Sequence, residues 1–236
     1  MSLLAPFTKK SKLNTTINLT EQARKSDGNS QEGLFKAAYQ GYAEILQDDA
    51  LRAETLYHWG FALFHQANTK TGEVAANLYQ DAIEKFSFCM LINPNYLAAA
   101  INSGVAYMDL ARLNKANADD RLYLLAKKQF EKANIIQAGT AAYNLACIYA
   151  MQGNIEACLA ELQDARRKVT LPVISDILND PDMSTVKNQA WFTSFIASLN
   201  QDIKDAEAKR EAEVEAKIIA AELKKLKKTT KDDLFY

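Results

Sequence analysis

Apolar stretches alternate with short polar stretches along the chain, and this pattern repeats at an interval of 44 positions. Gly60 and Gly104 are separated by this interval, and so are Phe86 and Phe130. Three further pairs keep the same spacing: Ala82 with Ala126, Tyr79 with Tyr123, and Gly28 with Gly72. Agreement of this kind at one offset predicts an internal repeat, in which each unit has the same local structure.

Each repeat unit consists of two predicted helices that are separated by a polar turn. The second helix of the first full unit ends before Pro94, because proline cannot continue a helix. A less regular pair precedes this unit, with its polar turn at 26–30. The predicted helices run over about 31–47, 51–67, 73–92, 97–113 and 121–137.

Residue size explains which positions recur. Two antiparallel helices approach closely only where side chains are small, as at Gly60 and Gly104, and Phe86 and Phe130 fill the space beside them. One helical pair cannot bury its apolar face alone, so neighbouring pairs must stack. The predicted fold class is therefore all-α, a solenoid of helical hairpins.

The composition supports a helical fold. The 236 residues include only 8 glycines and 4 prolines, which disfavours turn-rich β-sandwiches and barrels. The net charge of −1 lacks the basic excess typical of nucleic-acid binders, so no nucleic-acid partner is expected. No apolar run approaches the roughly 20 residues of a transmembrane helix, and the N-terminus lacks the pattern of a signal peptide.

The third unit resembles a tetratricopeptide repeat (TPR). Leu145, Ala146, Tyr149, Gly153 and Cys158 follow the spacing of that family without a gap. The first two units depart from it in the same way, since Leu63 to Ala82 spans 19 positions where Tyr149 to Cys158 spans 9. The extra residues are mostly helix formers, which predicts longer helices in those two units.

The resemblance implies a TPR-like α-solenoid, and it divides the chain into five parts. After the repeats, the segment from Asp180 to Met183 resembles the closing segment of bacterial TPR proteins. The expected parts are an N-terminal segment with a degenerate hairpin (1–50), the repeats (51–167, as units 51–94, 95–138 and 139–167), capping helices (168–200), a charged amphipathic helix (201–228) and a tail (229–236).

The segment 201–228 contains neither glycine nor proline, and a narrow apolar stripe runs along it. The stripe has a 4-3-4-3 spacing, through Ala212, Ala216, Ile219, Leu223 and Leu226. Lysines crowd its C-terminal end, at Lys224, Lys225, Lys227 and Lys228. Three interpretations stay open for this cluster: a solvated helix end, contact with an acidic protein or membrane surface, and contact with nucleic acid.

Few residues suggest catalysis or cofactor binding. His58 and His65 lie seven positions apart on one predicted helix face, but no third ligand or nucleophile accompanies them. Cys89 and Cys158 occupy positions where the repeat needs small residues, and Cys147 completes an odd number of cysteines with no metal-ligand spacing. The sequence therefore predicts no enzyme, no cofactor and no metal site, in a reduced, cytoplasmic protein.

The resemblance implies a protein-binding groove, because the first helix of each TPR pair lines a concave surface that holds peptides or helices. The expected partner is a helix or an extended peptide of apolar character. Several candidates could instead be buried between neighbouring helices. The candidates are Tyr57, His58, Phe61, Phe64, His65, Ile101, Asn102, Val105, Met108, Asp109, Tyr143, Asn144, Cys147 and Met151.

The expected function is that of a non-catalytic adaptor or assembly factor that binds another protein in this groove. One alternative is a self-associating structural or scaffold subunit, with the C-terminal helix as a contact between copies. A second alternative is an accessory subunit of an enzyme complex.

Overall fold

The structure is a computed structural model that describes the backbone of residues 5–232 and the side chains of 9–48 and 50–220. Over this range the chain forms ten α-helices, two short 3-10 helices and no β-strand, which confirms the all-α prediction. The chain divides into two compact units, the first ending at Pro172 and the second beginning at Val173.

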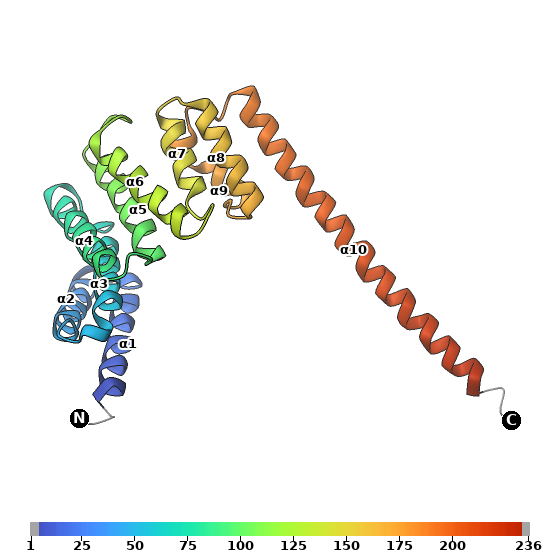
Figure 1. The fold of residues 1–236 in the computed structure, drawn as a ribbon, viewed down its shortest axis with the longest axis horizontal. Coiled ribbons are helices and arrows are strands. Elements are labelled where there is room, and N and C mark those ends of the chain that lie inside the picture. The colour runs from blue at the N-terminus through green and yellow to red at the C-terminus, as the bar shows by residue number, and fades with distance from the viewer. Residues whose placement is uncertain (1–4, 233–236) are drawn as a thin grey trace. The chain divides into compact units, whose positions relative to one another are not determined.

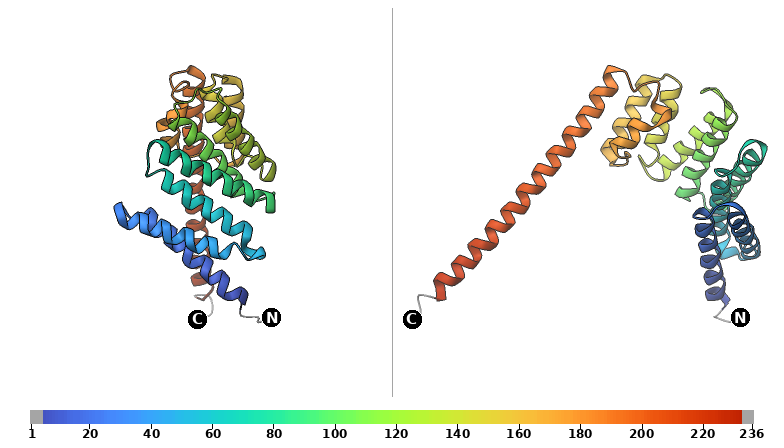
Figure 2. Two further views of the ribbon diagram at one scale, coloured as in Figure 1. Left: turned by 90° about the vertical axis from the view of Figure 1, so that its left-hand side faces the viewer. Right: turned by 180° about the vertical axis from the view of Figure 1, so that it is seen from behind.

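The first unit consists of four helical hairpins that follow one another along the chain. In Figure 1 they stack in sequence order as the colour passes from blue to yellow, and Figure 2 shows the same succession from two other sides. The hairpins are α1 (Ala5–Arg24) with α2 (Gly28–Ile45), α3 (Arg52–Ala67) with α4 (Gly72–Ile92), α5 (Leu97–Leu113) with α6 (Arg121–Ile136), and α7 (Ala142–Met151) with α8 (Ile155–Lys168). A 3-10 turn, η1 (Asp49–Leu51), leads into α3.

Helices α3 to α6 have the bounds that the polar turns and Pro94 predict, to within one residue at each end. They contain 16, 21, 17 and 16 residues, whereas α7 and α8 contain 10 and 14. The expected elongation of the first two full units is therefore confirmed.

Two pairs of residues at the 44-residue interval have clear structural roles. Gly28 and Gly72 begin α2 and α4 with φ of +54° and +59°, a left-handed conformation that glycine adopts without steric cost. Inside the hairpins, Gly60 and Gly104 lie directly against the rings of Phe86 and Phe130. The repeated residues thus shape the turns and the close contacts between paired helices.

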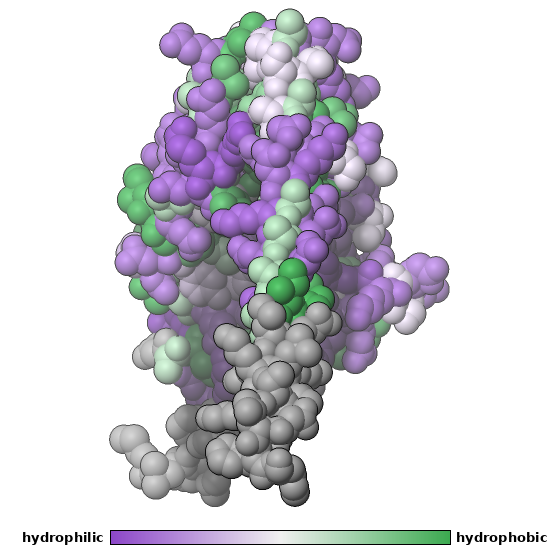
Figure 3. Space-filling view, turned by 90° about the vertical axis from the view of Figure 1, so that its right-hand side faces the viewer, coloured by the Kyte–Doolittle hydropathy of each residue, from purple (hydrophilic) through white to green (hydrophobic). Residues whose placement is uncertain are grey.

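The second unit contains α9 (Ile174–Asn179), the 3-10 turn η2 (Pro181–Met183) and α10 (Ala190–Asp232). Its buried apolar side chains, Ile177, Met183, Val186, Phe192, Phe195, Ile196 and Leu199, all precede residue 200, whereas every residue in 200–220 is exposed. Figure 3 looks onto this exposed part of α10.

The expected boundary at 201 does not coincide with the start of a helix. A single helix begins at Ala190 and continues to Asp232, because no glycine or proline interrupts 190–232 and the change at 201 is only from buried to exposed residues. The expected tail begins inside this helix, at 229, and its residues 233–236 lie outside the described part of the chain. None of the described helices combines the length and the apolarity that a membrane span requires.

Candidate partner-binding surface

The candidate surface comes from the first helices of three successive hairpins, α3, α5 and α7. Phe64, Met108 and Cys147 lie in the core. The ring of Phe64, for example, is 5.9 Å from the ring of Tyr79 on α4, inside the hairpin. The other candidates are half-buried: Tyr57, His58, Phe61, His65, Ile101, Asn102, Val105, Asp109, Tyr143, Asn144 and Met151.

Tyr57 connects α3 to the beginning of α5. Its ring lies 4.9 Å from the ring of Tyr96, and its hydroxyl accepts a hydrogen bond of 3.2 Å from the Asn102 side-chain amide. Burial raises the pKa of the Tyr57 hydroxyl. One N–H of the Asn102 side-chain amide is therefore bonded within the protein. The second N–H and the carbonyl oxygen of this amide are further hydrogen-bonding groups.

Aromatic edges and a cation meet on the exposed side of α3. The rings of Phe61 and His65 are 4.3 Å apart, edge to face, and the guanidinium of Arg24 lies 5.2 Å from the centre of the Phe61 ring. Burial, followed by the positive charge of Arg24, lowers the pKa of His65 to about 4. Burial also lowers the pKa of His58. At neutral pH both imidazoles are therefore uncharged, and this part of the surface is mainly aromatic.

Sequence reasoning missed Tyr96 and Arg24, because both lie outside the helices that were expected to line the groove. Tyr96 directly precedes α5, and Arg24 ends α1. The only sequence signal for Tyr96 was an aromatic residue two positions after Pro94, at a turn. Arg24 had no such signal, since its contact with Phe61 depends on how α1 packs beside α3.

A shallow hollow adjoins the aromatic surface where α3 and α5 end. It has a volume of about 510 Å³ and is lined by Asn68, Tyr79, Asp109, Arg112 and Leu113. Asp109 and Arg112 form an ion pair one turn apart on α5, and the Tyr79 hydroxyl donates to Oδ1 of Asn68 at 2.6 Å. The surface is therefore apolar in its middle and polar at this end.

The family described as the plant-specific mitochondrial import receptor subunit TOM20 matches residues 30–152, which is more than half of the chain. The chain belongs to this family. A comparison of this chain with curated proteins finds no match. The matched range contains all of α3, α5 and α7, and so every candidate residue of the partner-binding surface.

The TOM20 match corrects one expectation and supports others in a general form. The expected cytoplasmic location is wrong, because the family is a mitochondrial import receptor subunit. The expectation rested on an odd number of cysteines without metal-ligand spacing, and this property does not separate the cytoplasm from an organelle. A receptor subunit is a non-catalytic, protein-binding class of molecule, in agreement with the expected helical repeat and adaptor role.

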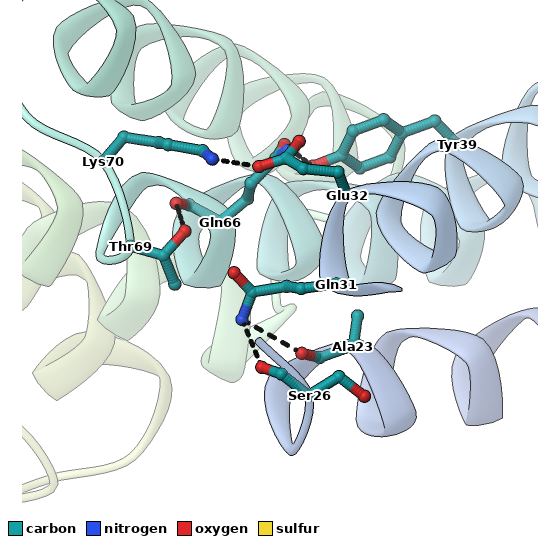
Figure 4. Close-up of polar contacts among 8 residues, drawn as sticks. All are labelled: Ala23, Ser26, Gln31, Glu32, Tyr39, Gln66, Thr69 and Lys70. Atoms are coloured by element: carbon teal, nitrogen blue, oxygen red, sulfur yellow. Dashed lines mark hydrogen bonds and ion pairs between the residues drawn. The ribbon is translucent and has the colours of Figure 1, made fainter. Parts of the chain in front are cut away.

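In this TOM20-family chain, buried amide side chains fix how α2 packs against its neighbours. The Gln66 side chain on α3 accepts a hydrogen bond of 2.6 Å from the Tyr39 hydroxyl and donates one of 2.9 Å to Glu32, both on α2 (Figure 4). Glu32 also pairs with Lys70. On the other side of α2, the amide of Gln31 donates to the backbone carbonyls of Ala23 and Ser26 (Figure 4). These contacts hold α3, and with it Tyr57 and Phe61, in a defined position.

A second hollow lies on the other helices of the repeat, between α4 and α6. Its volume is about 470 Å³. Leu91 and Ile135 line it at equivalent positions of the repeat, with 75% and 85% of their surface exposed. Sequence reasoning missed this hollow, although the 44-residue interval between two large apolar residues was a visible signal. The remaining lining residues are Ser87, Met90, Lys128, Gln129, Glu131 and Lys132.

Burial keeps two of the cysteine thiols protonated. The three cysteines form no disulfide and are buried, and burial raises the pKa of Cys89 and Cys158 to about 12, so that neither of these two thiols is ionised at neutral pH. His58 and His65 belong to no cluster of three potential metal ligands among the described side chains. The side chains of Leu223, Leu226 and the four predicted surface lysines at 224, 225, 227 and 228 lie outside the described residues.

Proposed function

We propose that the protein is a mitochondrial import receptor subunit that binds a helical or extended segment of a precursor protein on α3, α5 and α7. The observation that supports this function most directly is the overlap between the TOM20 match and the half-buried aromatic surface on these helices. Residues that are neither in the core nor fully exposed offer apolar area that a partner can cover.

The chemistry of the surface favours an amphipathic helix as the ligand. Phe61, Ile101 and Val105 are half-buried apolar residues on neighbouring helices, and they offer contact to the apolar face of a ligand helix. Arg24 on one side and the Asp109–Arg112 pair on the other provide charges at the rim. Apolar contacts in the middle with charges around them are the usual arrangement of a protein interface.

Binding of a labelled amphipathic helical peptide, followed by fluorescence anisotropy, tests this function. We expect Phe61→Glu to weaken binding by about 30-fold, which corresponds to about 2 kcal/mol, because a charge replaces a central aromatic contact. Asn144→Ala combined with Phe61→Glu should weaken binding further, since it removes an amide that can pair with the ligand backbone.

Phe88→Glu is the matched control. Phe88 lies on α4, the second helix of the same hairpin, and 53% of its surface is exposed. The same change there should leave the affinity within twofold of the original value. Far-UV circular dichroism confirms that both variants remain helical. If Phe88→Glu weakens binding and Phe61→Glu does not, the ligand binds to the second helices and the proposed surface is wrong.

A further inference from the structure

The hollow between α4 and α6 is lined by apolar side chains that the packing of the hairpins does not cover. Most apolar positions of the repeat are buried where helices pack, but Leu91 and Ile135 leave 75% and 85% of their surface exposed. The buried side chain of Met90 also lines this hollow. Its volume of about 470 Å³ lies within the roughly 300–1,000 Å³ that is typical of ligand pockets. The hollow can therefore receive a large apolar side chain of a partner.

The lining of the hollow also carries positive charge. Lys128, Lys132 and Ile135 occupy positions i, i+4 and i+7 of α6, so they lie on one face of this helix. Neither lysine has an ion-pair partner among the described side chains. The carboxylate of Glu131, which lines the hollow as well, lies 3.9 Å from the ammonium of Lys127. The one acidic charge of the lining is therefore offset within the protein, and two basic charges are left for a partner.

A partner that complements these residues has large apolar side chains flanked by acidic ones. We propose that the hollow between α4 and α6 binds an acidic amphipathic helix of a partner protein. An apolar side chain of this helix inserts between Leu91 and Ile135, and its carboxylates lie beside Lys128 and Lys132. A side chain that projects into the hollow reaches the buried Met90, which a flat lipid surface would not, so the shape favours a protein partner.

This contact does not depend on the proposed function. Its residues belong to the second helices of two hairpins, α4 and α6, whereas the half-buried aromatic surface belongs to the first helices, α3, α5 and α7. The same two hairpins would then carry two binding surfaces for two different partners.

A labelled peptide tests the contact by fluorescence anisotropy. The peptide is designed as a helix with leucines on one face and glutamates on both sides of that face. We expect Ile135→Gln to weaken its binding by about tenfold, because an apolar contact is lost. Lys132→Glu should weaken binding by about fivefold, because the glutamates of the peptide then meet a like charge. Raising the NaCl concentration should weaken the binding of the unmodified protein, since salt screens the charge pairs.

Two substitutions elsewhere on α6 are the matched controls. Leu124 is apolar with 53% of its surface exposed, and Arg121 is an exposed cation. Each lies eleven positions before the hollow residue that it matches, roughly 16 Å along the helix, and neither lines the hollow. Leu124→Gln and Arg121→Glu should leave the affinity within twofold of the original value. Phe61→Glu should do so too, which separates this contact from the aromatic surface.

Four outcomes would overturn this contact. The unmodified protein binds the peptide with a Kd weaker than about 100 μM. A peptide with lysine in place of every glutamate binds equally well, which would show that the basic lining does not select the partner. Phe61→Glu weakens binding and Ile135→Gln does not, which would place the peptide on the aromatic surface. Vesicles of anionic phospholipid bind the protein but not Ile135→Gln, while the peptide does not bind, which would assign the hollow to a lipid surface.

Discussion

The hairpin of α5 and α6 is packed tightly at Gly104. A Cβ atom there would lie 2.5 Å from Cε1 of Phe130, closer than real contacts allow. We expect Gly104→Ala to lower the free energy of unfolding by about 1–3 kcal/mol, measured by urea denaturation, because the ring must shift in a packed core. Gly33→Ala is the control, since Gly33 lies in α2 with open space around it, and there the change should raise the free energy of unfolding by about 0.5–1 kcal/mol. Equal losses at both positions would contradict the packing argument.

His65 makes stability depend on pH. Its pKa is about 4 in the folded protein and 6.5 in the unfolded chain, so between these values the unfolded chain binds more protons. The contribution of His65 to stability is therefore complete above pH 6.5 and is lost as the pH falls towards 4. We expect the free energy of unfolding, measured by urea denaturation at pH 7 and pH 5, to decrease less in His65→Gln than in the unmodified protein. An identical decrease in both proteins would mean that other groups cause it.

At the level of single helices, two aspartates directly precede α-helices, but only one of them caps its helix. The Asp120 carboxylate accepts a hydrogen bond of 2.8 Å from the backbone N–H of Leu122, at the beginning of α6. Asp27 precedes α2 and makes no such bond. We expect Asp120→Ala to lower the free energy of unfolding by about 1 kcal/mol and Asp27→Ala to change it by a few tenths at most, measured by chemical denaturation. A larger loss at Asp27 would show that helix-dipole effects outweigh the capping bond.

The lengths of single helices were predictable for the repeat helices but not for α10. The polar turns that end α3 to α6 are visible in the sequence, and these helices begin and end where they were expected. The start of α10 was not visible in this way, because the composition changes at 201 from aromatic residues to alanine and charged residues, while the helix continues without a glycine or proline.

For the whole molecule, the buried part of α10 and its exposed part should contribute differently to stability. The buried residues Phe192, Phe195, Ile196 and Leu199 all precede Asn200. We expect a chain that ends at Asn200 to keep the thermal midpoint of the full protein, measured by circular dichroism. A chain that ends at Gln189 should unfold at a clearly lower temperature, because it loses these four side chains, each contributing about 1.5–3 kcal/mol when buried. A midpoint that falls equally in both truncations would mean that 201–236 stabilises the repeats.

The sequence by itself was sufficient for the fold class, the 44-residue repeat and the bounds of the repeat helices. These properties follow from local chemistry: the polar turns, Pro94, and the need for glycine where Phe86 and Phe130 fill the space. The mitochondrial location of the family could not be derived from the sequence, because residues with the same packing roles occur in helical repeats of every compartment.

Only the tertiary structure decided which candidate residues are accessible. Phe64 and His65 are neighbours on one helix, yet the first is buried and the second half-buried, because successive side chains lie about 100° apart around a helix and only Phe64 is directed towards α4. Likewise, the contacts of Tyr57 with Tyr96 and of Arg24 with Phe61 depend on how separate helices stack. Spacing along the chain identifies the face of a helix, but the distance to the neighbouring helix determines how much of that face a partner can reach.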